Sequence, residues 1–335
     1  MKIAVDAMGG DYAPDQIVKG ALEAAEAMPG VELILAGDEE AIKKVDGYKE
    51  LANVSISHVT GVISVNDGPV SRSRENTITA CCALVKEKKA DAFVSAGNTG
   101  ACMAAAVINW KKIKGIDRPA IPTPIPTPHG EVILIDAGAT ADCRPLNLYQ
   151  FAIMGAIYSE RIFGRKNPRI GLLSNGTEDR KGSKLTLETF GLLKNSKLNF
   201  IGNVEGSSVF KNICDVIVCD GFTGNIMLKS IESACEMLIS TAKKMIDGIV
   251  CAPEETQAGG AGPVSSPFLK VIGELQKKLD YAEYGGAPLL GVPGTCIISH
   301  GSSKAKAVKN AIGVAQKFAS EKINEKIEQD ISQLF

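Results

Sequence analysis

The sequence predicts an α/β fold with three layers, in which helices cover both faces of a mostly parallel sheet. Short β-branched apolar runs recur along the 335 residues, each followed by a polar loop with glycine and then by a segment of helical periodicity. Near-continuous apolar strands that alternate with helices are typical of parallel sheets buried on both faces. The apolar content of 45% and the charged content of 22% fit a globular chain rather than a disordered one.

Seven apolar runs are the expected strands. In chain order they are residues 2–5, 32–36, 92–94, 132–135, 170–173, 216–219 and 296–298. The carboxyl ends of parallel strands share one edge of a sheet, and ligands bind outside that edge. Several of the loops there also open a helix, whose free N–H groups and dipole favour an anion. The loops therefore predict a single large cleft for a phosphate-like group.

Two further segments have a distinct pattern. Residues 121–128 read Ile-Pro-Thr-Pro-Ile-Pro-Thr-Pro, and proline cannot donate to a ladder, so we expect a rigid crossover there. Apolar residues at helical spacing over 304–331 predict one C-terminal helix, with Ser302 or Ser303 as its N-cap.

Residues 226–284 predict a helical hairpin that projects from a single catalytic unit spanning 1–335. Two stretches carry apolar residues three and four apart, and a Pro- and Gly-rich connector at 251–267 joins them. Such a pair either packs on its own domain or pairs with a second subunit. Contact with a membrane surface is a weaker alternative, because Glu254 and Glu255 at the tip would repel anionic lipid.

The charge balance and the cysteine usage exclude several classes of protein. Lys and Arg number 37 against 38 Asp and Glu, so the basic excess of a nucleic-acid binder is missing. No apolar run approaches the roughly 18 residues of a spanning helix, and Asp6 and Asp11 interrupt the position of an export signal. Nine cysteines without a C-x-x-C pair, and three histidines, indicate a reduced cytoplasmic protein with no metal site.

Three common catalytic fingerprints are missing from the sequence. No G-x-G-x-x-G follows a strand, no G-x-x-x-x-G-K-[ST] occurs, and no G-x-S-x-G elbow occurs. A nicotinamide site, a P-loop and a serine hydrolase are therefore disfavoured. We expect no cofactor.

Polar loops at the expected strand ends carry the candidate chemistry. In Asp-Gly-Phe-Thr-Gly-Asn (220–225) the glycines let the backbone approach a ligand, and Asn225 either donates to that ligand or caps the long helix. In a neighbouring charged loop, Lys181 either neutralises a phosphate as a point charge or belongs to a solvated turn. His300 either acts on a substrate or is a structural histidine.

Eight motifs in order carry a resemblance to a known family. They are IAVDAMGGDYAP (3–14), VSAGNTGA (94–101), KGIDRPA (114–120), GTEDRKG (176–182), FIGNVEG (200–206), CDGFTGN (219–225), YGGAPLLG (284–291) and HGSS (300–303). Together they closely resemble the bacterial PlsX family of phosphate acyltransferases, which make acyl phosphate from acyl-acyl carrier protein, over essentially the full length.

The resemblance implies a fold like that of phosphotransacetylase and isocitrate dehydrogenase, in a cytosolic homodimer of phospholipid synthesis. It also implies acyl carrier protein and inorganic phosphate as partners. Loose membrane association is implied as well, because a membrane glycerol-3-phosphate acyltransferase uses the product. Two other functions stay open: a short-chain phosphotransacetylase acting on acyl-coenzyme A, and a non-catalytic scaffold for lipid synthesis.

Acyl transfer from a thioester to phosphate needs positioning and charge stabilisation rather than a strong base. We expect Lys181 to hold the phosphate or oxyanion charge, Asn225 to donate to the carbonyl oxygen, and His300 to orient phosphate or protonate the thiolate. The other residues expected to line the substrate site are Asp6, Gly9, Gly10, Asp11, Gly97, Asn98, Thr99, Gly100, Asp136, Thr177, Glu178, Asp220, Thr223, Gly224 and Ser302.

The chain departs from the family pattern at 69–78, which is shorter and less basic around Arg72 and Arg74, and at the hairpin tip 252–260, which is more polar. An acidic carrier protein would dock on a basic patch. The candidate patches, either of which can also be a solvated face, are Lys111, Lys112, Lys114 and Arg118, or Lys243 and Lys244.

Overall fold

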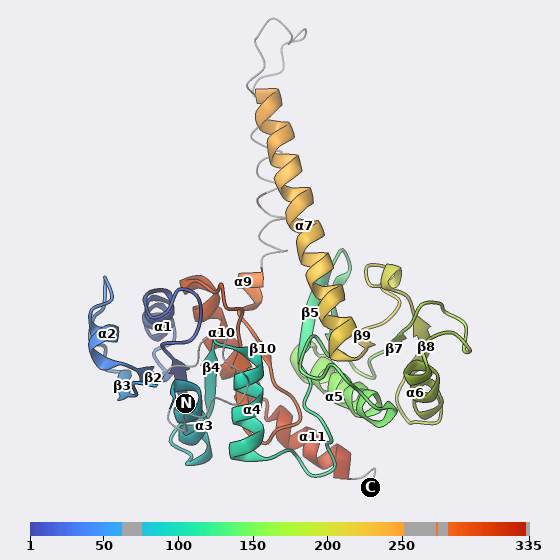
Figure 1. The fold of residues 1–335 in the computed structure, drawn as a ribbon, viewed down its shortest axis with the longest axis horizontal. Coiled ribbons are helices and arrows are strands. Elements are labelled where there is room, and N and C mark those ends of the chain that lie inside the picture. Colours follow the sequence, from blue (N-terminus) through green and yellow to red (C-terminus); the bar gives the residue numbers. More distant parts are fainter. Residues whose placement is uncertain (62–75, 251–272, 274–280, 333–335) are drawn as a thin grey trace, which may run out of the picture.

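The protein is described by a computed structural model that covers residues 1–61, 76–250, 273 and 281–332. Figure 1 shows two lobes side by side, each built around one sheet, with the long helix α7 (Gly221–Val250) rising away from them. The predicted α/β class with helices on both sheet faces is confirmed. The strands, however, form two sheets rather than one.

The first lobe holds a six-stranded sheet that is parallel except for one edge strand. Its order is β10 (Ala287–Pro288), β11 (Thr295–Ile298), β4 (Ala92–Ser95), β1 (Lys2–Asp6), β2 (Glu32–Gly37) and β3 (Val54–His58). Side chains alternate across β1, so Ile3 and Val5 face one core while Ala4 faces another. The helices on the first face are α1 (Asp15–Ala27) and α10 (Ala305–Ser320), and those on the second are α3 (Thr77–Lys86) and α4 (Thr99–Trp110). The short helix α2 (Glu39–Lys43) joins β2 to β3.

The second lobe holds a five-stranded sheet. Its order is β5 (Pro122–Thr127), β6 (Gly130–Ile135), β9 (Val216–Val218), β7 (Ile170–Leu173) and β8 (Phe200–Val204). One face packs on α5 (Pro145–Phe163) and α6 (Lys184–Lys194). The other face packs on the first turns of α7 and on Val209, which follows the short helix η1 (Gly206–Ser208). One apolar core runs through both lobes, because Ile3 of β1 and Ile133 of β6 belong to the same cluster.

In the part of the chain that the structure describes, one isolated β-bridge links the backbones of the two lobes. The amides and carbonyls of Ala120 and Leu290 exchange hydrogen bonds of 3.1 Å and 2.9 Å, just before β5 and just after β10. The sheets separate beyond this bridge, and the carboxyl ends of β4, β6 and β11 surround the space between them.

Three sequence-based expectations about elements need correction. Residues 121–128 are not a crossover, because Pro122–Thr127 forms β5, an antiparallel edge strand, which is where a ladder tolerates proline. The C-terminal segment is two helices, α10 and α11 (Ile323–Ser332), separated at Lys322, whose φ is 51°. The residue that caps α10 is Lys304, which forms no side-chain cap bond, rather than either serine.

Only the first arm of the expected hairpin, α7, and the short helix α9 (Tyr281–Tyr284) fall largely within the described residues. The connector 251–267, the polar tip 252–260, most of the second arm, and Arg72 and Arg74 lie outside them. No helix in the described part of the chain combines the length and the apolar character that crossing a bilayer requires.

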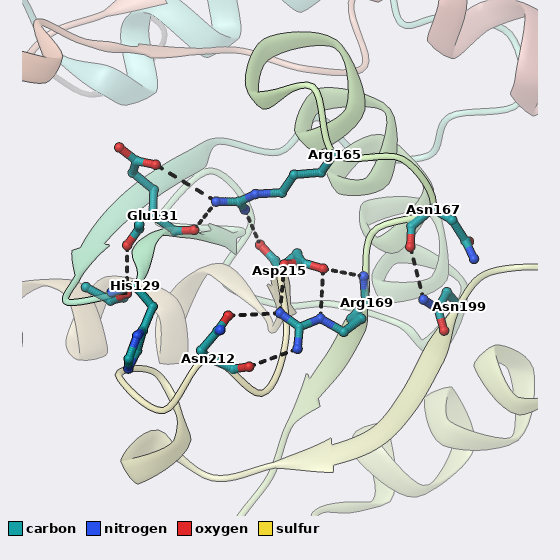
Figure 2. Close-up of polar contacts among 10 residues, drawn as sticks. His129, Glu131, Arg165, Asn167, Arg169, Asn199, Asn212 and Asp215 are labelled. Carbon is teal, nitrogen blue, oxygen red and sulfur yellow. Dashed lines mark hydrogen bonds and ion pairs between the residues drawn. The ribbon is translucent and has the colours of Figure 1, made fainter.

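The amino ends of the five-stranded sheet are joined by a closed polar network (Figure 2). Arg169, just before β7, donates from Nε and Nη2 to the carboxylate of Asp215, just before β9, at 3.1 Å and 3.0 Å. Its Nη1 donates to the carbonyl of Asn212 at 2.8 Å. Arg165 donates to the backbone carbonyls of Asp215 and of Glu131 in β6. The network ties three parallel strands together at the edge opposite the predicted cleft.

Candidate active site

A cavity of about 330 Å³ lies between the two sheets at the carboxyl ends of their strands. The six-stranded lobe contributes Thr99, Ser299 and His300, and the five-stranded lobe contributes Gly138 and Asn225. Its remaining walls come from α7, from the start of β5 and from residues 284–287. The cavity therefore joins loops that are more than 200 residues apart in the sequence.

Asp6 fixes the loop that follows β1. Its side chain is fully buried, and its carboxylate accepts from Ser95 Oγ at 2.6 Å and from the amide of Met8 at 3.3 Å. Burial raises the pKa of Asp6, and these hydrogen bonds oppose the rise. Gly9 is packed so closely on this carboxylate that a Cβ there would overlap it. The carboxylate is thus enclosed by its own loops rather than facing the cavity.

The loops after β1, β4 and β11 touch one another. The amide of Asp11 donates to the carbonyl of Gly301 at 2.8 Å. A Cβ on Gly10, whose φ is 111°, would lie 3.2 Å from both Ala96 Cβ and the Gly301 carbonyl oxygen, so the close approach requires glycine. The predicted meeting of these three loops is therefore present in the structure.

Helix α4 begins at the cavity. Asn98 caps it, since its Oδ1 accepts from the amide of Ala101 at 2.9 Å. Thr99, the first helical residue, lines the cavity, and Gly97 and Gly100 flank it in sequence. The first N–H groups of a helix carry partial positive charge, so this end of α4 suits an oxyanion.

Asp136 fixes the corresponding loop of the second sheet. It is fully buried after β6, and its carboxylate accepts from four backbone amides, those of Ile121, Gly138, Ala139 and Thr140, at 2.7 to 3.1 Å. Burial raises the pKa of Asp136, and the four amides oppose the rise. Like Asp6, this carboxylate is enclosed by the loop that it organises.

The first turn of α7 packs on the Asp136 loop. Asp220 caps the helix, accepting from the amide and the hydroxyl of Thr223 at 2.9 Å and 2.8 Å. Gly224 is tightly packed, because a Cβ there would overlap the carbonyl oxygen of Asp136. Asn225 follows inside the helix rather than capping it, and it lines the cavity beside Gly138. Within the described residues its amide group has no hydrogen-bond partner.

His300 occupies the opposite wall of the cavity. Its Nδ1 lies 2.7 Å from Ser302 Oγ, and its Nε2 lies 3.2 Å from Nζ of Lys229 on α7. The backbone amide of Ser302 also donates to Nδ1, at 3.2 Å. Desolvation and the Lys229 charge lower the pKa of His300. The imidazole is therefore neutral at neutral pH.

The structure places Lys181, Thr177 and Glu178 elsewhere. They are exposed in the loop after β7, where Asn203 holds the Glu178 carbonyl at 2.8 Å. Next to this loop lies a second cavity of about 560 Å³, which Asp220 and Thr223 also line, on the other side of the start of α7. Lys181 lines neither of these two cavities.

Two charged residues of the inter-sheet cavity were missed by the sequence reasoning. Lys229 and Glu232 line it from α7, with Lys229 Nζ 2.7 Å from Glu232 Oε2. Lys229 stands four residues after Asn225, and residues at that spacing share a helix face. This spacing is the signal that would have identified Lys229.

Comparisons with known proteins identify the family. The family model described as "Fatty acid synthesis protein" matches residues 1–326. A protein named phosphate acyltransferase from Desulforamulus reducens is 43% identical, with 98% of each chain covered. One of the same name from Pelotomaculum thermopropionicum is 46% identical, over 100% of this chain and 96% of its own.

A solved phosphotransacetylase from Streptococcus pyogenes shares the fold, with a TM-score of 0.59 over 96% of this chain and 94% of that one, at 16% identity. This agrees with the fold that the motifs implied. The family resemblance inferred from the sequence is confirmed as well. The chain belongs to the PlsX family of phosphate acyltransferases.

Proposed function

We propose that this enzyme moves a fatty acyl group from an acyl-acyl carrier protein thioester to inorganic phosphate, in the cavity between its two sheets. The acyl phosphate so formed would enter phospholipid synthesis. The observation that carries the proposal is the convergence on one cavity of the α4 N-terminus at Thr99, the unpaired amide of Asn225, and His300. The curated relatives named phosphate acyltransferase support the same reaction.

The chemistry is a substitution at the thioester carbonyl. A phosphate oxygen attacks the carbonyl carbon, a C–O bond forms, and the C–S bond breaks. The proton of the hydrogen phosphate passes to the leaving thiolate, so the products are acyl phosphate and a free thiol. No redox partner is needed, and the protein's contribution is to hold both reactants and to stabilise the oxyanion.

We assign the oxyanion contact to Asn225. Its amide faces the cavity from a rigid helix that is fixed by the Asp220 cap and the tight packing of Gly224. A neutral donor held in this way costs no reorganisation when charge develops on the carbonyl oxygen. His300, neutral and on the opposite wall, is placed to relay the proton from phosphate to thiolate.

Asp6 and Asp136 have a different role in this proposal. Both carboxylates are buried and enclosed by hydrogen bonds from their own loops. An ionised carboxylate would also repel phosphate. We therefore assign them as positioning residues that shape the loops, with no contact to substrate.

The decisive test compares Asn225→Ala with Lys181→Ala in an assay of acyl phosphate formation, with folding checked by thermal melting. Removing one oxyanion donor lowers kcat by about 10²- to 10³-fold, so we expect that loss for Asn225→Ala. A smaller loss is expected for Lys181→Ala, because Lys181 lies away from this cavity. Near-wild-type rates for both variants would remove the mechanism. Comparing the rate with acyl-acyl carrier protein to the rate with acetyl-coenzyme A identifies the acyl donor.

We also propose that α7 takes part in assembly. Its exposed apolar side chains include Met237, Leu238 and Met245, which are 61%, 64% and 66% exposed. Pairing with a second copy, as the family resemblance implied, would cover them; a membrane surface is the other candidate. Leu238→Glu with Met245→Glu should convert a dimer to a monomer in light scattering, and an unchanged mass would exclude pairing through this face.

A further inference from the structure

The inter-sheet cavity has one feature that the proposed reaction has not used, which is its charge. Among the lining residues that the structure describes, Lys229 is the one with a permanent positive charge, and Glu232 is the one carboxylate. Lys229 Nζ lies 2.7 Å from Glu232 Oε2 and 3.2 Å from His300 Nε2. A cation inside the cavity is what an anionic phosphate requires.

The contact with His300 distinguishes Lys229 from an ordinary surface lysine. Lys229 belongs to α7 of the five-stranded lobe, while His300 follows β11 of the six-stranded lobe. The ammonium therefore contacts the other lobe across the cavity, although the Lys229 side chain is 47% exposed. Lys43 offers a contrast, since it forms an equally short 2.7 Å pair with Glu39 at a similar exposure, far from the cavity on the short helix α2.

The position of Lys229 also fits the reacting groups. It lies one helical turn after Asn225 on the same face of α7, so the ammonium and the oxyanion donor are neighbours. Thr99 and the α4 N-terminus line the same cavity. A phosphate held between this helix end and Lys229 would sit beside the acyl carbonyl that Asn225 polarises.

We propose that Lys229 is the phosphate-binding residue of the cavity, and that Glu232 and His300 hold its ammonium in place until phosphate arrives. Phosphate then replaces Glu232 as the anionic partner of Lys229. Exposed ion pairs within one helix are weak, and the Lys229 and Glu232 side chains are 47% and 33% exposed, so a multiply charged ligand can compete for the ammonium. This inference rests on the proposed function, because it assigns phosphate to the same cavity.

The kinetic test uses Lys229→Met, Lys229→Arg and, as the matched control, Lys43→Met. Phosphate is varied at saturating acyl-acyl carrier protein, and the acyl donor is varied at saturating phosphate. We expect Lys229→Met to raise KM for phosphate at least tenfold with KM for the donor within twofold, and Lys229→Arg to restore most of the affinity. Lys43→Met should match the wild type. A phosphate KM within twofold of wild type in Lys229→Met overturns the inference.

A second measurement uses the wild-type protein and phosphate alone, so it depends neither on turnover nor on the folding of a variant. The chain has three histidines, His58, His129 and His300, so the imidazole NMR signals of the labelled wild type are few. Titration with inorganic phosphate at constant ionic strength should shift the His300 signals and leave the other two unchanged, with chloride as the control. The charged groups that face His300 are Lys229, Glu232 and Asp11. No selective shift would place phosphate elsewhere and overturn the inference.

The two failures are distinguishable. If the wild type forms no acyl phosphate from any donor, the proposed function fails. If the wild type is active and Asn225→Ala is impaired, but phosphate KM in Lys229→Met and the His300 signals are unaffected, only the assignment of Lys229 fails.

Discussion

The five-stranded sheet has an aspartate at each end of its strands, and the two carboxylates have different kinds of hydrogen-bond partner. We call these two ends of the strands the amino edge and the carboxyl edge. At the amino edge, the Asp215 carboxylate is paired with the guanidinium of Arg169 in a closed network (Figure 2). At the carboxyl edge, the Asp136 carboxylate is satisfied by four backbone amides, and no cation contacts it among the described residues. At the amino edge the arginines form structural hydrogen bonds. At the carboxyl edge one cation, Lys229, lines the cavity.

The pKa shifts of the two aspartates follow from that difference. Burial opposes ionisation at both. At Asp215 the hydrogen bonds and charge of Arg169 outweigh burial and lower the pKa below 3.8. At Asp136 burial outweighs the amide hydrogen bonds and raises the pKa above 3.8. The comparison teaches that backbone amides can hold a buried carboxylate at the cavity without a cation beside it, at the expense of some stability.

The largest effect on stability is expected for Gly224→Ala, which changes the packing of α7 on the loop of Asp136. A Cβ at this position would overlap the Asp136 carbonyl oxygen, so α7 would have to move away from its loop. We expect a loss of about 4 kcal/mol in the free energy of unfolding, measured in denaturant. Gly191→Ala is the matched control, because this helical glycine has no atom within 4 Å of the added Cβ, and it should gain about 0.5–1 kcal/mol. Equal effects for the two variants would contradict the packing argument.

An intermediate effect is expected for Asp136→Asn. The amide keeps one acceptor oxygen but turns an NH₂ group toward at least one backbone N–H, which should cost about 2–3 kcal/mol. The folded pKa is raised, so the wild-type aspartate contributes most stability below pH 3.8 and progressively less as pH rises through its folded pKa. The difference in the free energy of unfolding between the wild type and Asp136→Asn should therefore become smaller as the pH rises in that window. A deficit that grows with pH would show that the pKa is lowered instead.

The smallest effect, with the opposite pH dependence, is expected for Asp215→Asn at the amino edge. The pair with Arg169 is partly exposed, at 37% for the arginine and 18% for the aspartate, so its loss should cost about 1–2 kcal/mol. The folded pKa is lowered, so this contribution is present above pH 3.8 and is lost as pH falls through the folded value. Acyl transfer should be unchanged, since this edge is remote from the cavity. Impaired turnover with normal melting would break the structural assignment.

Sequence reasoning predicted the central strands well because their apolar runs are nearly continuous. Residues 2–5, 92–94 and 170–173 all lie in observed strands. It missed β3 and β8, whose sequences VSISH and FIGNV mix polar residues with apolar ones because both are edge strands with a partly exposed face. The positions of the strand ends predicted where the loops would meet, but they did not predict how many sheets the strands would form.

The site was only partly predictable for a related reason. The meeting of Gly10 with the loops at Ala96 and Gly301 is a property of parallel strand ends, and the sequence pattern reports it. Whether Lys181 lines the same cavity as Asn225 depends on where the first turn of α7 lies relative to the loop after β7, which no local pattern records. Lys229 was missed because a lysine paired with a glutamate three residues later is also typical of any solvated helix.

The bridge between Ala120 and Leu290 has a consequence for how the cavity exists at all. In an antiparallel ladder the next pair to exchange hydrogen bonds would be Pro122 and Pro288. The peptide nitrogen of a proline is a tertiary amide without a hydrogen to donate, so the ladder stops after this one bridge and the two sheets do not join into one. The space between the two sheets therefore begins where two prolines prevent a second pair of backbone hydrogen bonds.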